Sequence, residues 1–171
     1  MKTIIVTGTP CTGKTTYAKK LAREKGYKYL DVNQVIKAKK LKESYDGKRK
    51  CYIIDTARLN KALIELINKQ KKQENRTLKT DNREPRTDNR KLKTVKGLVI
   101  DSHLSHYLPR KYVDLCIVTK CNLKELKARL EKRGYSKQKI QENLQAEIFE
   151  ICLTEAQERG HKIKIIDTSK K

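Results

Sequence analysis

Short runs of branched apolar residues alternate along the chain with segments in which apolar residues recur at helical spacing. The runs predict buried strands at residues 4–6, 27–30, 97–101, 113–119 and 163–166. The segments between them predict helices over residues 14–25, 31–41, 55–70, 122–133 and 136–158. Because strands that alternate with helices pair in parallel, we predict a three-layer α/β sandwich with about five parallel strands.

Residues at the expected ends of helices support these boundaries. Gly26 ends the first helix, while Asn122 and Ser136 are of the type that caps a helix N-terminus through a side-chain oxygen. After the helix at 31–41, the run Tyr45-Asp46-Gly47 predicts a polar turn. With 171 residues, the chain is expected to form a single domain over residues 1–171.

The segment at about 71–96 departs from this pattern. Large apolar residues almost vanish there, Pro85 interrupts the chain, and Thr80-Asp81-Asn82-Arg83 recurs as Thr87-Asp88-Asn89-Arg90. Such a composition cannot bury enough surface to order itself. We therefore predict a flexible, basic, low-complexity insertion within the domain.

The charge balance indicates the kind of binding partner, and the cysteines indicate the redox environment of the protein. Lys and Arg number 42 against 20 Asp and Glu, a formal net charge of +22. This excess predicts phosphate-rich partners such as nucleotides, RNA or anionic surfaces, although a lysine-rich proteome would produce it too. No segment approaches the roughly 20 apolar residues of a membrane span, and the first apolar run is too short for a signal peptide. Five scattered cysteines without a C-x-x-C pair disfavour a disulfide framework or a zinc site, and favour the reducing cytoplasm.

The strongest chemical signal lies between the first predicted strand and the first predicted helix. The run Gly8-Thr9-Pro10-Cys11-Thr12-Gly13-Lys14-Thr15 matches G-x-x-x-x-G-K-[ST]. In such a phosphate-binding loop (P-loop), glycines let the backbone curl until amide groups point at phosphate oxygens, and the following helix adds its positive end. The predicted nucleotide-binding residues of this loop are Gly8, Pro10, Cys11, Thr12, Gly13, Lys14, Thr15 and Thr16.

The loop and one later strand together predict ATP and Mg²⁺ as cofactors. Lys14 is predicted to place its ammonium between the β- and γ-phosphates, Thr15 to ligate Mg²⁺ and Thr16 to touch the α-phosphate. Asp101 ends an apolar strand, where a carboxylate for the Mg²⁺ shell is expected. The alternatives are a tight glycine turn with a surface lysine, and an aspartate that only caps a strand end.

Four blocks of residues, in order, resemble the adenylate kinase isoenzyme 6 family of small archaeal and eukaryotic P-loop NTPases. The blocks are residues 7–16; Tyr29-Leu30-Asp31-Val32-Asn33 with Tyr45-Asp46 and Ile54-Asp55; Val99-Ile100-Asp101-Ser102-His103; and residues 129–135 followed by 139–143 and 146–148. The last block, R-L-x-x-R-G-Y and then K-I-x-E-N, is specific because ordinary adenylate kinases carry a longer lid there. The chain departs from the family at Cys11, where glycine is usual, so Cys11 must tolerate the backbone angles of the loop or alter nucleotide affinity. Residues 103–109 keep the family pattern only in outline.

The resemblance implies a nucleoside-monophosphate kinase that transfers the γ-phosphoryl group of ATP to AMP in a Mg²⁺-dependent reaction. It places an AMP-side segment at about 31–54 and a short lid at about 128–138. It also implies weak ATPase activity and a role in maturing the small ribosomal subunit, with a small-subunit ribosomal protein and pre-rRNA as partners.

Several cations and histidines are candidates for the reaction centre. Arg129 and Arg133 lie four residues apart, on one helical face next to the lid. Arg129 is predicted to stack on adenine or touch ATP phosphates and Arg133 to reach the transferred group; the alternative is that both are solvated helix charges. His103 is predicted to orient a water or the acceptor phosphate, unless it is structural. We expect His106 to be structural and His161 to lie on the surface.

Other assignments stay open. Asp31, Asn33 and Asp55 are candidates for the acceptor side, and each is equally a candidate helix cap. One alternative function is an ATP-switched assembly factor that binds a ribosomal protein and pre-rRNA, with incidental kinase turnover; another is a different small-molecule kinase. The insertion either binds rRNA through its charge or is a tolerated surface loop. The sequence makes no prediction of oligomeric state.

Overall fold

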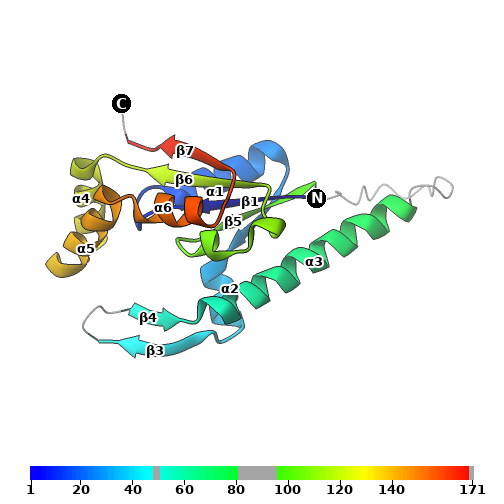
Figure 1. Ribbon diagram of the computed structural model, residues 1–171, viewed down its shortest axis with the longest axis horizontal. Coiled ribbons are helices and arrows are strands. Elements are labelled where there is room, and N and C mark those ends of the chain that lie inside the picture. The colour runs from blue at the N-terminus through cyan, green and yellow to red at the C-terminus, as the bar shows by residue number, and fades with distance from the viewer. Residues whose placement is uncertain (48–50, 81–95, 170–171) are drawn as a thin grey trace.

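Helices and strands alternate through most of the computed structural model, which describes residues 1–47, 51–80 and 96–169 (Figure 1). The strands are β1 (Lys2–Thr7), β2 (Lys28–Asp31), β3 (Lys42–Asp46), β4 (Cys51–Ile54), β5 (Gly97–Asp101), β6 (Leu115–Lys120) and β7 (Ile163–Asp167). The helices are α1 (Lys14–Lys25), α2 (Val32–Ala38), α3 (Thr56–Thr80), α4 (Leu123–Lys132), α5 (Lys137–Ile148) and α6 (Ile151–Glu158), with short 3₁₀ helices η1 (Ser105–Tyr107) and η2 (Arg110–Tyr112).

Five strands form one parallel sheet in the order β2-β5-β1-β6-β7. The central strand β1 is apolar and buried, and its Ile5 pairs with Ile100 on one side and Cys116 on the other. Continuous apolar runs suit strands that are covered on both faces. The predicted parallel sheet is therefore confirmed, with all five of its strands.

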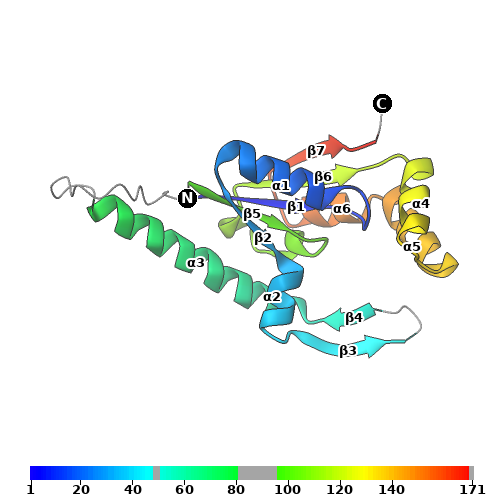
Figure 2. The same ribbon diagram turned by 180° about the vertical axis from the view of Figure 1, so that it is seen from behind.

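The two faces of the sheet carry separate cores. Side chains alternate along a strand, so neighbouring residues of β1 enter different layers. Ile5 packs in a cluster with side chains of α3 and α6, whereas Ile4 and Val6 pack with side chains of α1. Figures 1 and 2, which view the molecule from opposite sides, show α6 in front of the sheet in one and α1 in the other. The three-layer α/β sandwich is confirmed.

A hairpin of β3 and β4 projects from the sandwich, and the sequence did not predict it (Figure 2). Its strands pair antiparallel with one another in a separate two-stranded sheet. Tyr45 and Asp46, expected in a polar turn, instead end β3. The strand carries almost no buried residue, so it lacks the apolar alternation by which a half-buried strand is recognised.

Helix α3 runs ten residues further than predicted, through Thr80, and so enters the segment expected to be a flexible insertion. Residues 71–80 of the segment predicted to be flexible are therefore helical. Lys, Gln and Glu dominate residues 71–74 and are good helix formers, and Glu74 forms an ion pair with the ammonium of Met1 at 2.8 Å. Residues 81–95 of the predicted insertion lie outside the described residues. Within the described ranges, no helix is both long and apolar enough to cross a membrane.

The single helix predicted over 136–158 is two helices. Glu150 has a positive φ of 52°, which ends α5 and redirects the chain into α6, so that Leu153 and Ala156 reach the core. The predicted caps are confirmed: the side chains of Asn122 and Ser136 accept from the amides three residues later. His161, expected at the surface, is instead buried.

Candidate active site

The P-loop connects the buried end of β1 to α1 through three residues with positive φ: Gly8, Cys11 and Gly13, at 139°, 69° and 83°. A Cβ on Gly8 would lie 2.5 Å from the Thr119 carbonyl oxygen, so only glycine fits there. Gly13 occupies the N-cap position of α1 without a capping side chain. The first amides of the helix therefore lack the side-chain acceptor that usually satisfies them, which is the arrangement that anion-binding helices use.

Cys11 adopts the backbone conformation that its place in the family pattern demanded. A side chain in this left-handed region costs roughly 1–2 kcal/mol relative to glycine. Neighbours hold the turn: the Arg129 guanidinium donates to the Cys11 carbonyl at 3.3 Å, and Arg133 lies 3.8 Å from the Cys11 thiol. Cys11 thus tolerates the loop, supported by the two arginines of the predicted lid.

Lys14 lies at the start of α1 with its ammonium donating to the Thr9 carbonyl at 2.7 Å. Desolvation lowers its pKa to about 8, although the charges of Asp101 and Glu147 oppose that shift. The Lys14 side chain is therefore mostly protonated at neutral pH. Its ammonium is held by the same loop that a phosphate would enter.

Thr15 and Asp101 meet, although 86 positions separate them in the sequence. The Thr15 hydroxyl donates to Asp101 Oδ2 at 2.6 Å, and the Tyr29 hydroxyl donates to the same oxygen at 2.9 Å. Burial, followed by the bond to Asp101, raises the pKa of Tyr29. A hydroxyl and a carboxylate are the hard oxygen donors that Mg²⁺ prefers, so the pair fits the predicted metal ligands.

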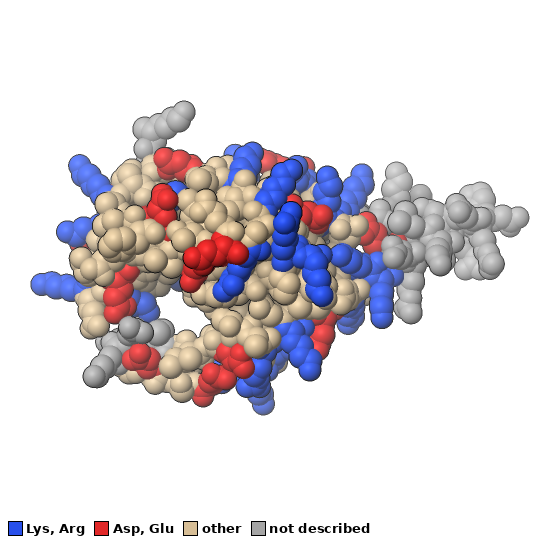
Figure 3. All heavy atoms as spheres, in the orientation of Figure 1, with Lys and Arg blue, Asp and Glu red and all other residues tan. Residues whose placement is uncertain are grey.

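One cleft of about 1350 Å³ brings together the P-loop, the ends of β5 and β7, the segment predicted to be a lid and the hairpin. Figure 3 shows it as a hollow between the hairpin and the rest of the molecule. The cleft is lined by most of the predicted site residues: Pro10, Cys11, Gly13, Lys14, Thr15, Thr16, Asn33, Asp101, His103, Arg129 and Arg133. Lys37, Lys42 and Tyr52 also line it, on the side of α2 and the hairpin; they fall within the predicted AMP-side segment at about 31–54, although none was among the predicted site residues.

Four predicted residues do not line the cleft. Gly8 and Thr12 lie behind the loop, where the Thr12 hydroxyl donates to the Thr9 carbonyl at 2.7 Å. Asp31 accepts from the Asn33 amide, and Asp55 accepts from the first amides of α3. Both aspartates thus make the helix-cap contacts that were the alternative for them, while Asn33 is the acceptor-side candidate that reaches the cleft.

The two histidines of the β5–η1 connection differ. Desolvation and the nearby Lys14 lower the pKa of His103 to about 4, so it is neutral in the cleft at physiological pH. His106 is buried under the loop, with Nδ1 2.7 Å from the Thr7 hydroxyl and Nε2 2.7 Å from Glu155. The structural role expected for His106 is confirmed. His161 joins it, with its Nε2 2.9 Å from the His106 carbonyl oxygen.

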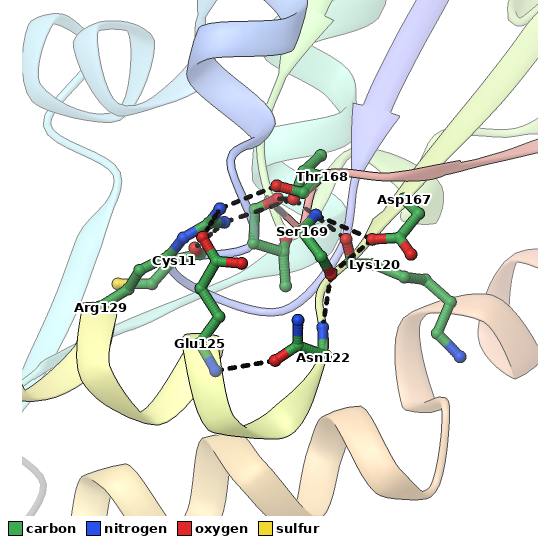
Figure 4. Close-up of polar contacts among 9 residues, drawn as sticks. Cys11, Lys120, Asn122, Glu125, Arg129, Asp167, Thr168 and Ser169 are labelled. Atoms are coloured by element: carbon green, nitrogen blue, oxygen red, sulfur yellow. Dashed lines mark hydrogen bonds and ion pairs between the residues drawn. The ribbon is translucent and has the colours of Figure 1, made fainter. Parts of the chain in front are cut away.

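Arg129 is held by protein groups on several sides (Figure 4). Nη1 donates to the Cys11 carbonyl and to the Thr168 hydroxyl, and Nη2 donates to Glu125 and to the Thr168 carbonyl. It is therefore not a solvated helix charge. Arg133 is exposed and lies over the ring of Tyr135, with its guanidinium carbon 5.6 Å from the centroid.

Two further residues fix the P-loop, and neither was assigned a role from the sequence, although Glu147 lies in the family block at 146–148. Glu147 of α5 is buried; it accepts from the Thr9 hydroxyl at 2.5 Å and from the Cys121 amide at 3.0 Å. Thr168, just after β7, contacts the loop as well. Both lie more than 130 positions from the loop in sequence, and only the tertiary fold brings them there.

Comparison with known proteins gives consistent matches over nearly the whole chain. A family model described as an AAA domain matches residues 4–150. The chain is 34% identical over 160 residues to a Methanocaldococcus jannaschii protein named "Putative adenylate kinase", covering 94% of this chain and 75% of the relative. It is 30% identical over 163 residues to the "Adenylate kinase isoenzyme 6 homolog" of Dictyostelium discoideum, covering 95% and 78%. A solved Chloroflexus aurantiacus structure, titled a putative kinase, shares the fold with a TM-score of 0.51 and 15% identity, over 98% of this chain and 88% of that one.

Proposed function

Because the chain belongs to the adenylate kinase isoenzyme 6 family of nucleoside-monophosphate kinases, we propose that it transfers the γ-phosphoryl group of ATP to AMP and so forms two ADP. The observation that carries this proposal is a single cleft, bordered at one end by the P-loop and at the other by α2 and the hairpin. Such a cleft offers room for a donor and an acceptor side by side.

At the donor end, the amides of the P-loop and the ammonium of Lys14 bind the triphosphate. In this structure the Lys14 ammonium donates to the Thr9 carbonyl. When the triphosphate binds, its oxygens replace that carbonyl as the acceptors of the ammonium. Thr15 and Asp101 would hold Mg²⁺, which neutralises the charge on the β- and γ-phosphates when bound. Tyr29 keeps the Asp101 carboxylate oriented by donating to it.

At the acceptor end, the cleft walls offer groups that suit a nucleoside monophosphate. Asn33 contributes an amide, and Lys37 and Lys42 contribute cations for the phosphate. Arg133, on the lid at about 128–138, supplies positive charge that phosphoryl transfer requires. His103 also lines the cleft, and we assign it a hydrogen bond to the acceptor phosphate or to a water.

A coupled assay that measures ADP formed from ATP, with and without AMP, tests the proposal. We expect AMP to raise ADP output at least tenfold, and Asn33→Ala to raise the KM for AMP while leaving the KM for ATP unchanged. Gln34→Ala is the matched control, since Gln34 is exposed next to Asn33 and does not line the cleft. If AMP leaves the ATP-only rate unchanged, the kinase proposal fails.

The second candidate is an ATP-switched assembly factor for the small ribosomal subunit, with ATPase activity and with a ribosomal protein and pre-rRNA as partners. The net charge of +22 favours it, and Figure 3 shows Lys and Arg side chains gathered over the face that carries α3. Electrostatic binding to RNA weakens steeply with salt. Titration of an RNA duplex at rising salt concentration tests it, and affinity that stays absent at low salt would remove this candidate.

A further inference from the structure

The last residue of β7 and the two residues after it, 167–169, run beside the P-loop as a strap (Figure 4). The Thr168 amide donates to the Lys120 carbonyl at 2.9 Å, and the Asn122 amide donates to the Ser169 hydroxyl at 2.8 Å. The strap is therefore anchored to the end of β6 and the start of α4 independently of the loop.

From this anchored position, Thr168 reaches the loop through its hydroxyl. Its Oγ1 lies 2.6 Å from the Thr12 carbonyl oxygen and 3.0 Å from the Lys120 carbonyl oxygen. The Lys120 oxygen already accepts from the Thr168 amide, so the hydroxyl proton goes to Thr12, where the distance is shorter. A Cβ built on Gly13 would lie 3.2 Å from the same hydroxyl oxygen, so the threonine is packed directly over the turn.

The hydrogen bond from Thr168 to the Thr12 carbonyl determines the direction in which the Gly13 amide points. In a planar trans peptide, fixing the Thr12 carbonyl also fixes the plane that contains the Gly13 N–H. Arg129 acts on the preceding peptide in the same way, because its guanidinium donates to the Cys11 carbonyl and to both oxygens of Thr168. Two successive peptide planes of the loop are thus held from outside.

Such external support matters because Cys11 occupies a conformation that favours glycine. A non-glycine residue at this φ strains the backbone of the loop in its phosphate-binding shape. If the hydrogen bonds from neighbouring residues are lost, the loop relaxes to another backbone conformation. We infer that Thr168 is a positioning residue for ATP binding: its hydroxyl holds the Cys11–Gly13 turn in the shape that Cys11 itself disfavours. The inference rests on the proposed binding of ATP by this loop, and it does not depend on the acceptor.

A double-mutant cycle tests this role, with the Kd for MgATP measured by calorimetry. Thr168→Val removes the hydroxyl and keeps the shape of the side chain, so we expect the Kd to rise about fivefold, the usual effect of one hydrogen bond. Thr168→Ser keeps the hydroxyl and should restore affinity to within about twofold. In a Cys11→Gly background, Thr168→Val should raise the Kd by less than about twofold, since the strain is gone.

The controls separate positioning from general stability. Thr154→Val changes an exposed threonine of α6 and should leave the Kd for ATP unchanged. In every variant the KM for AMP should stay constant. An equal rise of the Kd in both backgrounds, or a lower melting temperature with unchanged Kd, would overturn the inference. If the wild-type protein binds ATP but does not phosphorylate AMP, the kinase proposal fails, and the double-mutant cycle still tests the role of Thr168. If the wild-type protein binds no ATP, both the kinase proposal and the inference about Thr168 fail.

Discussion

The P-loop and the β3–β4 hairpin border the same cleft, but they are anchored differently. The loop follows the buried central strand and is held from behind by Glu147 and from outside by Thr168. The hairpin pairs only with itself among the described strands, and its Tyr45 and Tyr52 remain about half exposed at 56% and 49%. An isolated two-stranded hairpin is marginally stable by itself. The proposed donor end is thus preorganised, whereas the proposed acceptor end is the part of the cleft that binding can reshape.

The hairpin nevertheless has an order of its own. The rings of Tyr45 and Tyr52 pack at 5.1 Å between centroids, and the Lys42 ammonium lies 3.7 Å from the Tyr52 centroid. Since Lys42 and Tyr52 line the cleft, this cation–π pair places positive charge at the proposed acceptor end. The comparison therefore predicts that loss of the Lys14 ammonium from the loop nearly abolishes turnover, while substitutions at the hairpin change acceptor affinity alone.

The largest effect is expected at Lys14. In Lys14→Ala, the triphosphate loses the ammonium that the loop holds ready, so kcat should fall at least about a thousandfold. The ADP assay at saturating ATP measures it, with Lys25→Ala at the far end of α1 as the control. A kcat within tenfold of the wild-type value would show that Lys14 is a surface lysine of a glycine turn.

Asp101→Asn should have the next largest effect. The amide keeps the shape of the side chain but loses the negative charge that would hold Mg²⁺, so kcat should fall about a hundredfold and the Mg²⁺ concentration for half-maximal activity should rise. Tyr29→Phe, which removes one donor to the same oxygen, should cost less than tenfold. An unaltered Mg²⁺ dependence in Asp101→Asn would leave the aspartate a strand cap.

Tyr52→Ala tests the hairpin side of the comparison. It removes the ring that Lys42 contacts, so we expect the KM for AMP to rise about tenfold with little change in the KM for ATP. Ile53→Ala is the matched control, because Ile53 is also half exposed on β4 but does not line the cleft. Equal changes in both Michaelis constants would contradict a separate acceptor end.

The smallest effect is a pH dependence at the donor end. The pKa of Lys14 is lowered to about 8, so its ammonium is present below that pH and is lost as the pH rises through it. From pH 7 to pH 8.5 the protonated fraction falls about fourfold, and kcat/KM for ATP should fall with it. His103, with a pKa of about 4, should contribute no change between pH 6 and pH 8. A flat profile above pH 8 would place the functional pKa of Lys14 higher.

The same contrast explains how far the sequence could be interpreted. Apolar runs such as Ile4-Ile5-Val6 gave the five parallel strands, and the spacing of Gly8, Gly13 and Lys14 gave the loop, because both signals are local. The hairpin was not predicted because an exposed strand needs no apolar pattern. The break of the last long helix depends on one residue, Glu150, whose left-handed conformation has no mark in the sequence.

Contacts distant in sequence were beyond prediction for another reason. Glu147 and Thr168 support the loop through single hydrogen bonds. Thr168 belongs to no motif, and the family block at 146–148 does not indicate which partner Glu147 binds. Asp31 and Asp55 illustrate the reverse case, since residues that matched a family block are used as helix caps. Proximity to a motif in sequence did not determine which side chains reach the cleft.

The cysteine in the loop also gives the molecule a chemical handle. Of the four cysteines with described side chains, Cys116 and Cys121 are buried, and burial raises the pKa of Cys116 to about 12 and that of Cys152 to about 11. Cys11 lines the cleft and is partly open to solvent. Cys152 is partly open to solvent as well, but of these four only Cys11 lines the cleft, so a thiol-selective alkylating reagent that enters the cleft meets the Cys11 thiol there. Because a bound nucleotide would shield the Cys11 sulfur, the rate at which the reagent alkylates Cys11 would report how much of the site is occupied.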